Sequence, residues 1–451
     1  MAKHKKRRHQ RLPTEPIEVQ ITGLTAEGRG ITHIDGRTVF VDLALQGERV
    51  KCQYTARTAK YAEAVAVEIR QASPDRVEPA CAAFVRCGGC RLQHMSSSAQ
   101  LSLKQKMLLD QLEHIGQVKP QHILEPLTGP TLAYRHKARL GVRYVEKKDK
   151  VLVGFRERGG RYLTDMDTCE VLHEKVGKNI RAISDCLYQC HARRSIAQIE
   201  VAIGDEQTVM VFRHLEPLDS HDRSLLIDLS QSLAITFYLQ AGKPTELEAL
   251  WPQKPPTLFY SLPDYDLKIA FQPDDFTQVN PVINRKMVAL ALQHLQLKAE
   301  DRVLDLFSGL GNFSLSMARQ CASVTAVEGS LEMVKKARDN ARLNNIENVE
   351  FIFADLYNEA IKQMPWIKRQ YNKILLDPPR SGATAILPLL KKMRAEMIVY
   401  VSCHPATLAR DAGVLVNELG YTLKQTGIMD MFPHTTHVES IAVFFQKLHS
   451  G

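Results

Sequence analysis

The pattern of apolar and polar positions changes along the chain and first predicts a small all-β region. Residues 16–70 hold five short runs with strand character, separated by Gly-containing turns such as Asp35-Gly36. Five strands at hairpin spacing without a helix are typical of a small closed barrel, here OB-like. Barrels of this kind often bind oligonucleotides, but many are only structural, so the predicted fold alone indicates little about function.

The pattern then becomes helical and mixed. A break at Ser73-Pro74-Asp75 ends the barrel, and residues 97–115 place apolar side chains at helical spacing after a Ser cap. Strand and helix patterns alternate irregularly from about residue 131 to 270, with a Pro-rich connector at 251–256. This middle region predicts a central α+β domain.

The last region shows strict β/α alternation. Its apolar runs are residues 301–307, 323–329, 349–355, 373–379, 396–403 and 439–446. Continuous apolar strands separated by helices predict a parallel sheet covered on both faces, as in Rossmann-like α/β domains. The expected organisation is a tail at 1–13, a barrel at 14–73, a central domain at 74–270 and an α/β domain at 271–451.

Composition narrows the class of protein. Of the 451 residues, 44% are hydrophobic and 24% charged, which is ordinary for a soluble protein. No apolar run is long enough to cross a bilayer, and no apolar segment follows the basic N-terminus as in a secretory signal. We therefore expect a cytoplasmic protein without membrane contact, in which clustered cysteines indicate metal binding or catalysis rather than disulfides.

The net charge of +9 is unevenly spread. Residues 1–14 carry six Lys or Arg and no acid, and residues 135–161 carry ten against three acids. Basic tails and stripes bind polyanions because they release phosphate counterions. Charge thus favours nucleic-acid binding, the alternative being a solvated tail and an exposed sheet face.

Polar groups at strand ends predict a nucleoside site. The strand ending at Phe307 runs into a turn with Gly309 and Gly311, where backbone can approach a ligand closely. The next strand ends at Glu328, suited to ribose hydroxyls, and a third ends at Asp355, suited to an adenine edge.

The turn is not a dinucleotide fingerprint. It reads GLGNF with Asp305 upstream, which is the shorter D-x-F-x-G-x-G form found in methyltransferases. S-adenosylmethionine is therefore the predicted ligand, with NAD and a ligand-free αβ turn as alternatives.

Two further strand ends predict catalytic chemistry. They read Leu376-Asp377-Pro378-Pro379-Arg380 and Val401-Ser402-Cys403-His404-Pro405. Uracil C5 is too poor a nucleophile to attack a methylsulfonium, but a thiolate that adds to C6 turns the base into an enolate that is reactive at C5. Cys403 can supply that thiolate; otherwise it is a small buried hydrophobe.

A base must also remove the C5 proton. Glu439, at the head of the last strand, is the best placed carboxylate, unless it is a surface residue that only begins a strand. Adjacent strand residues point to opposite faces, so His404 is interpreted as a neighbour of Cys403 and not as its base.

Four cysteines form a candidate metal site. Cys81, Cys87 and Cys90 are clustered, and Cys169 is a distant fourth ligand. Three clustered thiolates and one thiolate far along the chain favour a 4Fe–4S cluster. Zinc, the alternative, commonly takes two C-x2-4-C pairs. The pair Cys186-x3-Cys190 lies on a predicted helix and is interpreted as core.

Together these motifs resemble the bacterial RNA uracil-5 methyltransferase family. The resemblance is carried by FTQVN at 276–280, DLFSGLGNF, LLDPPR, VSCHPATLARD and DMFPHTTHVES, and it reaches back through the cysteines to the barrel. It is closest to the TRAM-domain, iron–sulfur members that modify 23S rRNA, in particular those acting on uracil-1939. The resemblance implies a TRAM barrel, the 4Fe–4S cluster and a 23S rRNA substrate.

The resemblance also implies roles for single residues. It makes Cys403 the nucleophile and Glu439 the proton-abstracting base. It assigns to S-adenosylmethionine the residues Gln278, Phe307, Asn312, Glu328, Asp355 and Asp377. The chain departs from the family at Ser308, where Cys is usual, and at His404, where Asn is usual.

Two other functions compete with 23S rRNA methylation. A tRNA uracil-54 methyltransferase would use the same chemistry, but the tRNA enzymes that the chain resembles are expected to lack the barrel and the cysteines. A non-enzymatic iron–sulfur RNA-binding assembly factor would have no use for Cys403 and Glu439. We expect a monomer with no obligate protein partner.

Overall fold

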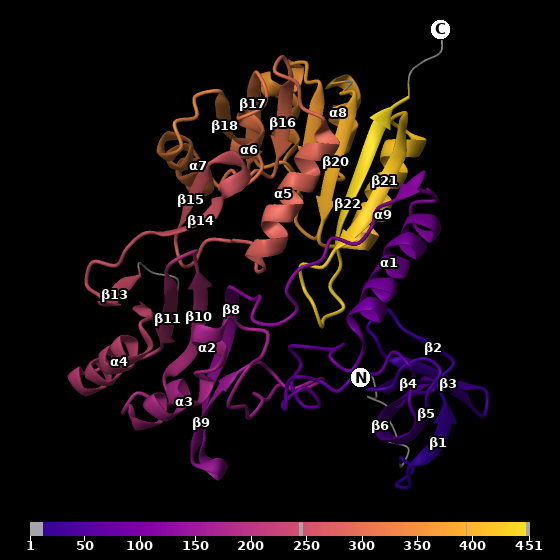
Figure 1. Ribbon diagram of the computed structural model, residues 1–451, viewed down its shortest axis with the longest axis vertical. Helices are drawn as coiled ribbons and strands as arrows, with labels where there is room; N and C mark the ends of the chain where they lie inside the picture. Colours follow the sequence, from indigo (N-terminus) through magenta and orange to yellow (C-terminus); the bar gives the residue numbers. More distant parts are fainter. Residues whose placement is uncertain (1–11, 243–246, 394, 448–451) are drawn as a thin grey trace, which may run out of the picture. The chain divides into compact units, whose positions relative to one another are not determined.

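The structure, a computed structural model, describes residues 12–242, 247–393 and 395–447 (Figure 1). It contains two compact units, Met1–Leu103 with His434–Thr436, and Lys104–Pro433 with His437–Gly451. Residues 1–11 of the predicted basic tail lie outside the described residues. The four-part division expected from the sequence, with boundaries after residues 13, 73 and 270, stays a prediction.

Unit 1 begins with a six-stranded sheet in the order β1-β5-β6-β4-β3-β2. The strands are β1 (Ile17–Gln20), β2 (Gly23–Leu24), β3 (Gly30–Ile34), β4 (Arg37–Asp42), β5 (Arg49–Arg57) and β6 (Tyr61–Gln71). The two ends of this order, β1 and β2, follow one another directly along the chain. The first segment therefore pairs on both sides and closes the sheet into the predicted barrel.

The barrel differs from the expectation in one respect. Five strands were predicted and six are present, because the run 17–24 is interrupted at Ile21 and Thr22. Ile21 turns inward there and is 1% exposed, packed with Val39, Val41 and Val50 in the barrel core. The break lets one apolar segment serve both sides of the closure.

Helix α1 (Ser97–His114) follows the cysteine segment and confirms the helix predicted at 97–115. The predicted Ser cap is Ser96, whose Oγ accepts a hydrogen bond from the Ala99 N–H at 3.3 Å. The boundary between the two units, Leu103/Lys104, falls within this helix. None of the helices that the structure describes is long and apolar enough to span a membrane.

The first part of unit 2 is a six-stranded sheet in the order β13-β12-β11-β10-β8-β9. Its strands are β8 (Lys137–Val145), β9 (Lys150–Gly154), β10 (Ile196–Ile203), β11 (Thr208–His214), β12 (Thr236–Ala241) and β13 (Glu248–Trp251). Three helices belong to this part: α2 (Glu174–Gly177), α3 (Ile180–Gln189) and α4 (Ser220–Leu233). The mixed pattern predicted for residues 131–270 is thus present.

A hairpin of β14 (Leu258–Leu262) and β15 (Leu267–Phe271) leads to an eight-stranded sheet, whose strands after residue 300 are orange to yellow in Figure 1. Its order is β18-β17-β16-β19-β20-β22-β21-β7. The strands are β7 (His122–Ile123), β16 (Arg302–Leu306), β17 (Ser323–Glu328), β18 (Val349–Phe353), β19 (Lys373–Leu376), β20 (Met397–Ser402), β21 (Tyr421–Met429) and β22 (Glu439–Gln446). The helices of this region are α5 (Pro281–Leu295), α6 (Ser314–Ala318), α7 (Leu331–Leu343), α8 (Leu387–Met393) and α9 (Pro405–Asn417).

The predicted parallel arrangement does not extend to the last strands of the sheet. The strands from β18 to β20 are parallel, but β22 runs antiparallel to β20, and β21 antiparallel to β22. The sequence pattern also missed β21. Its pairing with β22 shifts register between Leu423 and Gln425, which breaks the regular alternation of apolar residues.

A buried ion pair anchors the segment that precedes β22. Lys104, 1% exposed, donates a hydrogen bond from Nζ to Asp430 Oδ1 at 2.7 Å and another to the Phe432 carbonyl at 2.9 Å. Burial lowers the pKa of Lys104, and the Asp430 carboxylate opposes that shift. Removing one partner of such a pair leaves a buried charge uncompensated.

We therefore expect Lys104→Met to lower the free energy of unfolding of unit 2 by about 3 kcal/mol. Both tryptophans, Trp251 and Trp366, belong to unit 2, so tryptophan fluorescence in a urea titration reports its unfolding. The matched control is Lys106→Met, which removes a 72% exposed partner of Asp110 in the same helix. The control should change stability by less than about 1 kcal/mol; equal losses in both variants would contradict the assignment.

Candidate active site

The turn after β16 has the conformation of a ligand-binding turn. Phe307, a residue with a Cβ, has a φ of 68°, and Gly309 and Gly311 have φ values of 54° and 94°. A Cβ on Gly309 would meet no atom within 4 Å, whereas one on Gly311 would stand 3.0 Å from the Leu315 side chain. Backbone held in the left-handed region at a strand end is a feature of functional sites.

Glu328, at the end of β17, fixes this turn. Its Oε2 accepts a hydrogen bond from the Gly309 N–H at 3.0 Å, and its Oε1 accepts one from the Ser330 N–H at 2.9 Å. The two neighbouring strand ends are therefore tied together through one half-buried carboxylate.

Asn312 closes the turn through a second network. Its Oδ1 accepts hydrogen bonds from Tyr260 Oη at 3.0 Å and from Asn284 Nδ2 at 3.1 Å, and its Nδ2 donates to Asn284 Oδ1 at 3.0 Å. Gln278 lies half-buried in the loop between β15 and α5 and joins neither network in the described part of the chain.

Two further carboxylates belong to this region, the buried Asp305 of β16 and the half-buried Asp377 that follows β19. Asp305 accepts a hydrogen bond from the Ser314 hydroxyl through Oδ2, while its Oδ1 is buried without a hydrogen-bond partner among the described residues. Burial raises the pKa of Asp305 to about 7, and Asp377 and Glu328 reinforce the shift. Burial likewise raises the pKa of Asp377 to about 7. The region thus holds more carboxylates than nearby cations compensate.

Asp355 belongs to the same edge of the sheet. It lies just beyond β18, and its Oδ1 accepts a hydrogen bond from the Tyr357 N–H at 3.0 Å. The Tyr357 ring lies 6.1 Å from the ring of Phe307, centroid to centroid. The ends of β16 and β18 are therefore joined by an aromatic contact.

The antiparallel direction of β22 brings Glu439 to Cys403. Ser402, the last residue of β20, pairs with Ser440, so that the start of β22 lies at the carboxyl end of β20. Burial raises the pKa of the half-buried Cys403 thiol; the Glu439 and Asp377 carboxylates add to the shift, and Arg380 opposes it through its charge and a hydrogen bond. Glu439 is 3% exposed, and burial followed by the charge of Asp377 raises its pKa well above its ordinary value.

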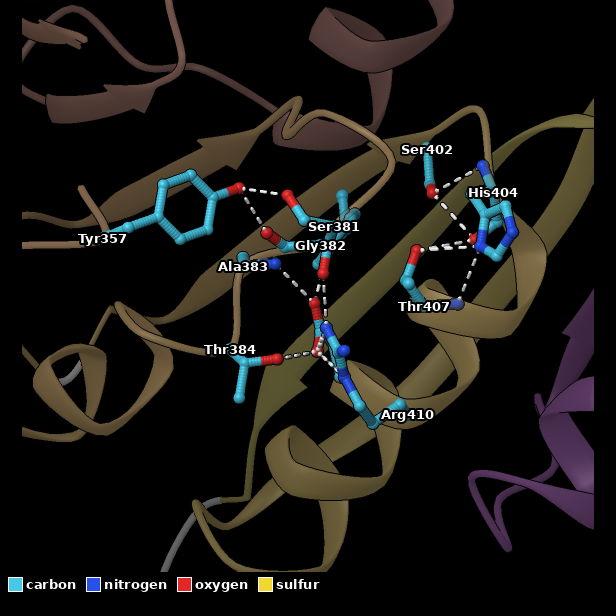
Figure 2. Close-up of polar contacts among 11 residues, drawn as sticks. Tyr357, Ser381, Gly382, Ala383, Thr384, Ser402, His404, Thr407 and Arg410 are labelled. Atoms are coloured by element: carbon cyan, nitrogen blue, oxygen red, sulfur yellow. Dashed lines mark hydrogen bonds and ion pairs between the residues drawn. The ribbon is translucent and has the colours of Figure 1, made fainter. Parts of the chain in front are cut away.

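His404 starts a helix instead of serving Cys403. Its Nδ1 accepts a hydrogen bond from the Thr407 N–H at 3.3 Å and caps α9, as Figure 2 shows. Ser402 Oγ in turn accepts from the His404 N–H at 3.1 Å. This capping role agrees with the interpretation of His404 as a neighbour of Cys403 and not as its base.

The cysteines predicted to bind metal lie in both units. In unit 1, Cys87 and Cys90 are buried and Cys81 is half-buried; the Gly89 N–H donates a hydrogen bond to Cys87 Sγ at 3.4 Å. In unit 2, Cys169 is buried. Cys186 lies on α3 as expected, and its thiol donates to the Leu225 carbonyl.

Comparison with known proteins gives the family. A family model described as tRNA (Uracil-5-)-methyltransferase matches residues 98–448, and a TRAM-domain model matches residues 10–67. The chain belongs to the tRNA (uracil-5-)-methyltransferase family. It is therefore an S-adenosylmethionine-dependent methyltransferase, and the predicted N-terminal barrel is confirmed as a TRAM domain.

Curated relatives match this chain over nearly its whole length. A protein of Alcanivorax borkumensis, named 23S rRNA (uracil(1939)-C(5))-methyltransferase RlmD, is 48% identical over 97% of this chain and 98% of its own. A protein of the same name from Francisella tularensis subsp. novicida is also 48% identical, over 97% and 98%.

A solved structure shows the same fold. The tRNA (uracil-54, C5)-methyltransferase of Pyrococcus abyssi, in complex with S-adenosyl-L-homocysteine, has a TM-score of 0.72 at 22% identity and matches 95% of this chain and 100% of its own. The 5% of this chain left unmatched is much shorter than the barrel. The expectation that tRNA enzymes of this family lack a barrel is therefore wrong for the Pyrococcus abyssi enzyme. The fold alone does not distinguish enzymes that act on tRNA from enzymes that act on 23S rRNA.

Three residues near the site were given no role from the sequence. Arg380 was quoted within a motif, but only the structure places its cation beside the Cys403 thiol. Tyr357 was missed, and Asp411 was quoted only as the last residue of VSCHPATLARD, because nothing in the local sequence indicates that their side chains bind the loop after Arg380. A Tyr two residues after Asp355 is the one available signal, and it is weak.

The buried carboxylates predict a pH dependence of stability. With a pKa of about 7 in the folded protein against 3.8 ordinarily, Asp305 holds a proton that the unfolded chain releases. The contribution of Asp305 to stability therefore falls as the pH rises from about 4 to 7. Asp305→Asn removes this loss. The free energy of unfolding of the variant minus that of the parent should therefore be larger at pH 8 than at pH 5, by roughly 2–3 kcal/mol.

Urea titrations of the ligand-free protein at both pH values measure this difference. Asp339→Asn, which alters a 69% exposed carboxylate, is the control and should give the same difference at pH 5 and pH 8. A constant offset between Asp305→Asn and the parent at both pH values would mean that Asp305 is ionised in the folded protein.

Proposed function

We propose that this enzyme transfers a methyl group from S-adenosylmethionine to C5 of a uracil in 23S rRNA, uracil-1939 in the relatives' numbering. The observation that carries the proposal is the meeting of Cys403 and Glu439 at the sheet edge that bears the turn after β16. The substrate class is supported by near full-length relatives that are named for 23S rRNA.

The residues of the edge fit S-adenosylmethionine. Asp305 Oδ1 and Ser308 Oγ are buried and, within the described residues, without hydrogen-bond partners, so a ligand with donors and positive charge would complete them. Glu328, Asp355 and Asp377 add further acceptors at the same edge. We assign the cofactor to the six residues that the sequence predicted, with Asn312 and Glu328 acting mainly by holding the turn in shape. The bound cofactor supplies an electrophilic methyl group on a sulfonium.

The protein's own residues perform the rest of the reaction. The Cys403 thiolate forms a bond to C6 of the uracil, and the electron pair of the C5–C6 bond moves onto the C4 oxygen as an enolate. C5 would then take the methyl group as the bond between that methyl and the sulfonium sulfur breaks, which would leave S-adenosyl-L-homocysteine. The Glu439 carboxylate removes the remaining proton from C5, the C5–C6 double bond forms again, and the bond between Cys403 and C6 breaks.

The charges of the site bear on the order of these steps. Burial and neighbouring carboxylates favour the neutral forms of both Cys403 and Glu439. A cation bound among these carboxylates lowers the pKa of each acid near it, because opposite charge favours the ionised form. Cofactor binding before thiol addition therefore prepares both groups.

The two residues should fail at different points. Cys403→Ala should bind RNA and cofactor but form neither covalent complex nor product. In Glu439→Gln, Cys403 should still add to C6 and C5 should still be methylated, but the C5 proton should not be removed. Methylated RNA should therefore accumulate as a covalent complex with Cys403. A denaturing gel with labelled 23S rRNA fragments should show a shifted band for Glu439→Gln alone. Normal turnover by either variant would overturn the corresponding role, and product on a tRNA transcript instead would overturn the substrate.

Cofactor binding is tested apart from catalysis. Glu328→Ala removes the carboxylate that holds the turn, and should raise the Kd for S-adenosyl-L-homocysteine at least about tenfold in calorimetry. Glu332→Ala, a 72% exposed carboxylate at the start of α7, is the matched control and should bind normally. Equal affinities for Glu328→Ala and the parent would remove Glu328 from the site.

RNA recruitment is assigned to the TRAM barrel and the basic residues 135–161. The net charge of +9 supports counterion release from RNA as a source of affinity. A cytoplasmic location is part of the same proposal, since rRNA is the substrate. We propose in addition that the enzyme is a monomer.

We also propose that Cys81, Cys87, Cys90 and Cys169 hold a 4Fe–4S cluster. Their thiol chemistry and burial suit it, and the Gly89 N–H bonded to Cys87 Sγ is a contact that stabilises a thiolate. When bound, such a cluster cross-links distant parts of a chain, and we assign it this structural role.

Anaerobically purified protein should contain about four irons per chain. Cys169→Ser should lose the iron and its visible absorption, whereas Cys186→Ser, the matched control on α3, should keep both. Stoichiometric zinc without iron in the parent protein would show that the four cysteines bind zinc instead of a cluster.

A further inference from the structure

Asp411, on α9, is a buried carboxylate to which the catalytic chemistry above gives no role. It is 0% exposed and accepts hydrogen bonds from the Ala383 N–H at 2.6 Å, the Tyr400 hydroxyl at 2.7 Å and Thr384 Oγ1 at 3.0 Å. Two of these donors belong to the loop after Arg380. One carboxylate of the helix that follows Cys403 therefore holds that loop.

A second layer of contacts leaves the loop little freedom. Arg410 donates from Nε to Asp411 Oδ1 at 2.9 Å and from Nη2 to the Ser381 carbonyl at 2.8 Å (Figure 2). Gly382, with a φ of 80°, lies so close that an added Cβ would stand 2.4 Å from Arg410 Nη2 and 2.7 Å from Asp411 Oδ2. The loop is packed directly against α9.

The other side of the loop is held by the cofactor edge. The Tyr357 hydroxyl lies 2.7 Å from Ser381 Oγ and donates to the Gly382 carbonyl at 2.9 Å, as Figure 2 shows. Tyr357 is itself bonded through its N–H to Asp355. The segment 381–384 thus links the nucleophile's helix to the strand end that bears Asp355.

Arg380 lies directly before this segment and faces Cys403. The groups around the Cys403 thiol are the carboxylates of Glu439 and Asp377 and the guanidinium of Arg380. Arg380 is the one cation among them in the described structure, so its position decides how much thiolate forms. The Arg380 side chain is exposed, its Nη2 lies 3.4 Å from His437 Nδ1, and its backbone leads directly into the loop that Asp411 holds.

We propose that Asp411 is a positioning residue that keeps Arg380 against the Cys403 thiol by fixing the loop Ser381–Thr384. The effect of Asp411 on catalysis rests on the proposed function, in which Cys403 is the nucleophile. The effect of Asp411 on the reactivity of the Cys403 thiol does not, because that reactivity is measured without RNA or cofactor.

The experiment follows alkylation of Cys403 by iodoacetamide in the full-length protein, quantified by mass spectrometry of its peptide between pH 6 and pH 10. Asp411→Asn should move the midpoint of the rate profile up by about one pH unit, which is about tenfold slower alkylation below the midpoint. Arg380→Gln should give the same shift. The double variant Arg380→Gln/Asp411→Asn should shift no further than Arg380→Gln alone, because both act through one guanidinium.

Asp222→Asn is the matched control. Asp222 is equally buried and accepts the N–H groups of His191 and Ala192, so the substitution makes the same chemical change away from Cys403. It should leave the alkylation profile unchanged even where it lowers stability. Thr384→Val removes one exposed donor to Asp411 and should give a smaller shift in the same direction, which serves as the test if Asp411→Asn does not fold.

An unchanged profile in a folded Asp411→Asn, additive shifts in the double variant, or an unchanged profile in Thr384→Val where Asp411→Asn fails to fold would each overturn the proposal. Failure of the proposed nucleophile would show differently, as methylation by Cys403→Ala, and would leave these alkylation results standing.

Discussion

The reversal of one strand is the constraint on which the active site depends. Parallel strands β16 to β20 carry their functional groups at one edge, but a further parallel strand would carry its first residue at the opposite edge. Because β22 is antiparallel to β20, with Ser402 opposite Ser440, its first residue, Glu439, lies beside Cys403. The buried pair Lys104–Asp430 fixes the chain just before this reversal.

The same edge concentrates acidic groups in a poorly solvated place. Asp305, Asp377 and Glu439 are all shifted towards their neutral forms by burial, and Arg380 is the nearby cation that favours a Cys403 thiolate. An arrangement of this kind costs stability in the empty protein and is compensated when a cationic ligand enters. Function and stability therefore make opposite demands on the same carboxylates.

The sequence predicted the strand ends well and the connections between them less well. Phe307, Glu328, Asp355, Asp377 and Cys403 follow apolar runs that could become only buried strands, so their common edge followed from the alternation of strands and helices. Glu439 was chosen from its place at the head of a strand, while the β/α alternation predicted a parallel sheet and did not indicate that the last strand is reversed. Strand direction depends on tertiary pairing, which a local pattern does not contain.

Other features were beyond local pattern for the same reason. Asp411 and Tyr357 act on a loop that is distant from them in the sequence, and Lys104 finds Asp430 more than 300 residues away. The roles of all the predicted site residues stay predictions; among them, Gln278 joins none of the described networks and the four cysteines are divided between two units. Short-range periodicity identified elements and strand ends, whereas contacts between distant side chains required the folded chain.

The edge of the large sheet has a consequence for how copies of the enzyme meet. Strand β21 would end the sheet with a row of unpaired carbonyls, but the segment 121–127 runs along it. Gln121, Leu124 and Leu127 donate their N–H groups to the carbonyls of Leu423, Thr426 and Ile428. A strand from another molecule finds few acceptors there, so edge-to-edge aggregation is blocked on this side by a segment that forms only two residues of strand, β7. The irregular segment thus covers one edge of a long apolar sheet by pairing with its backbone.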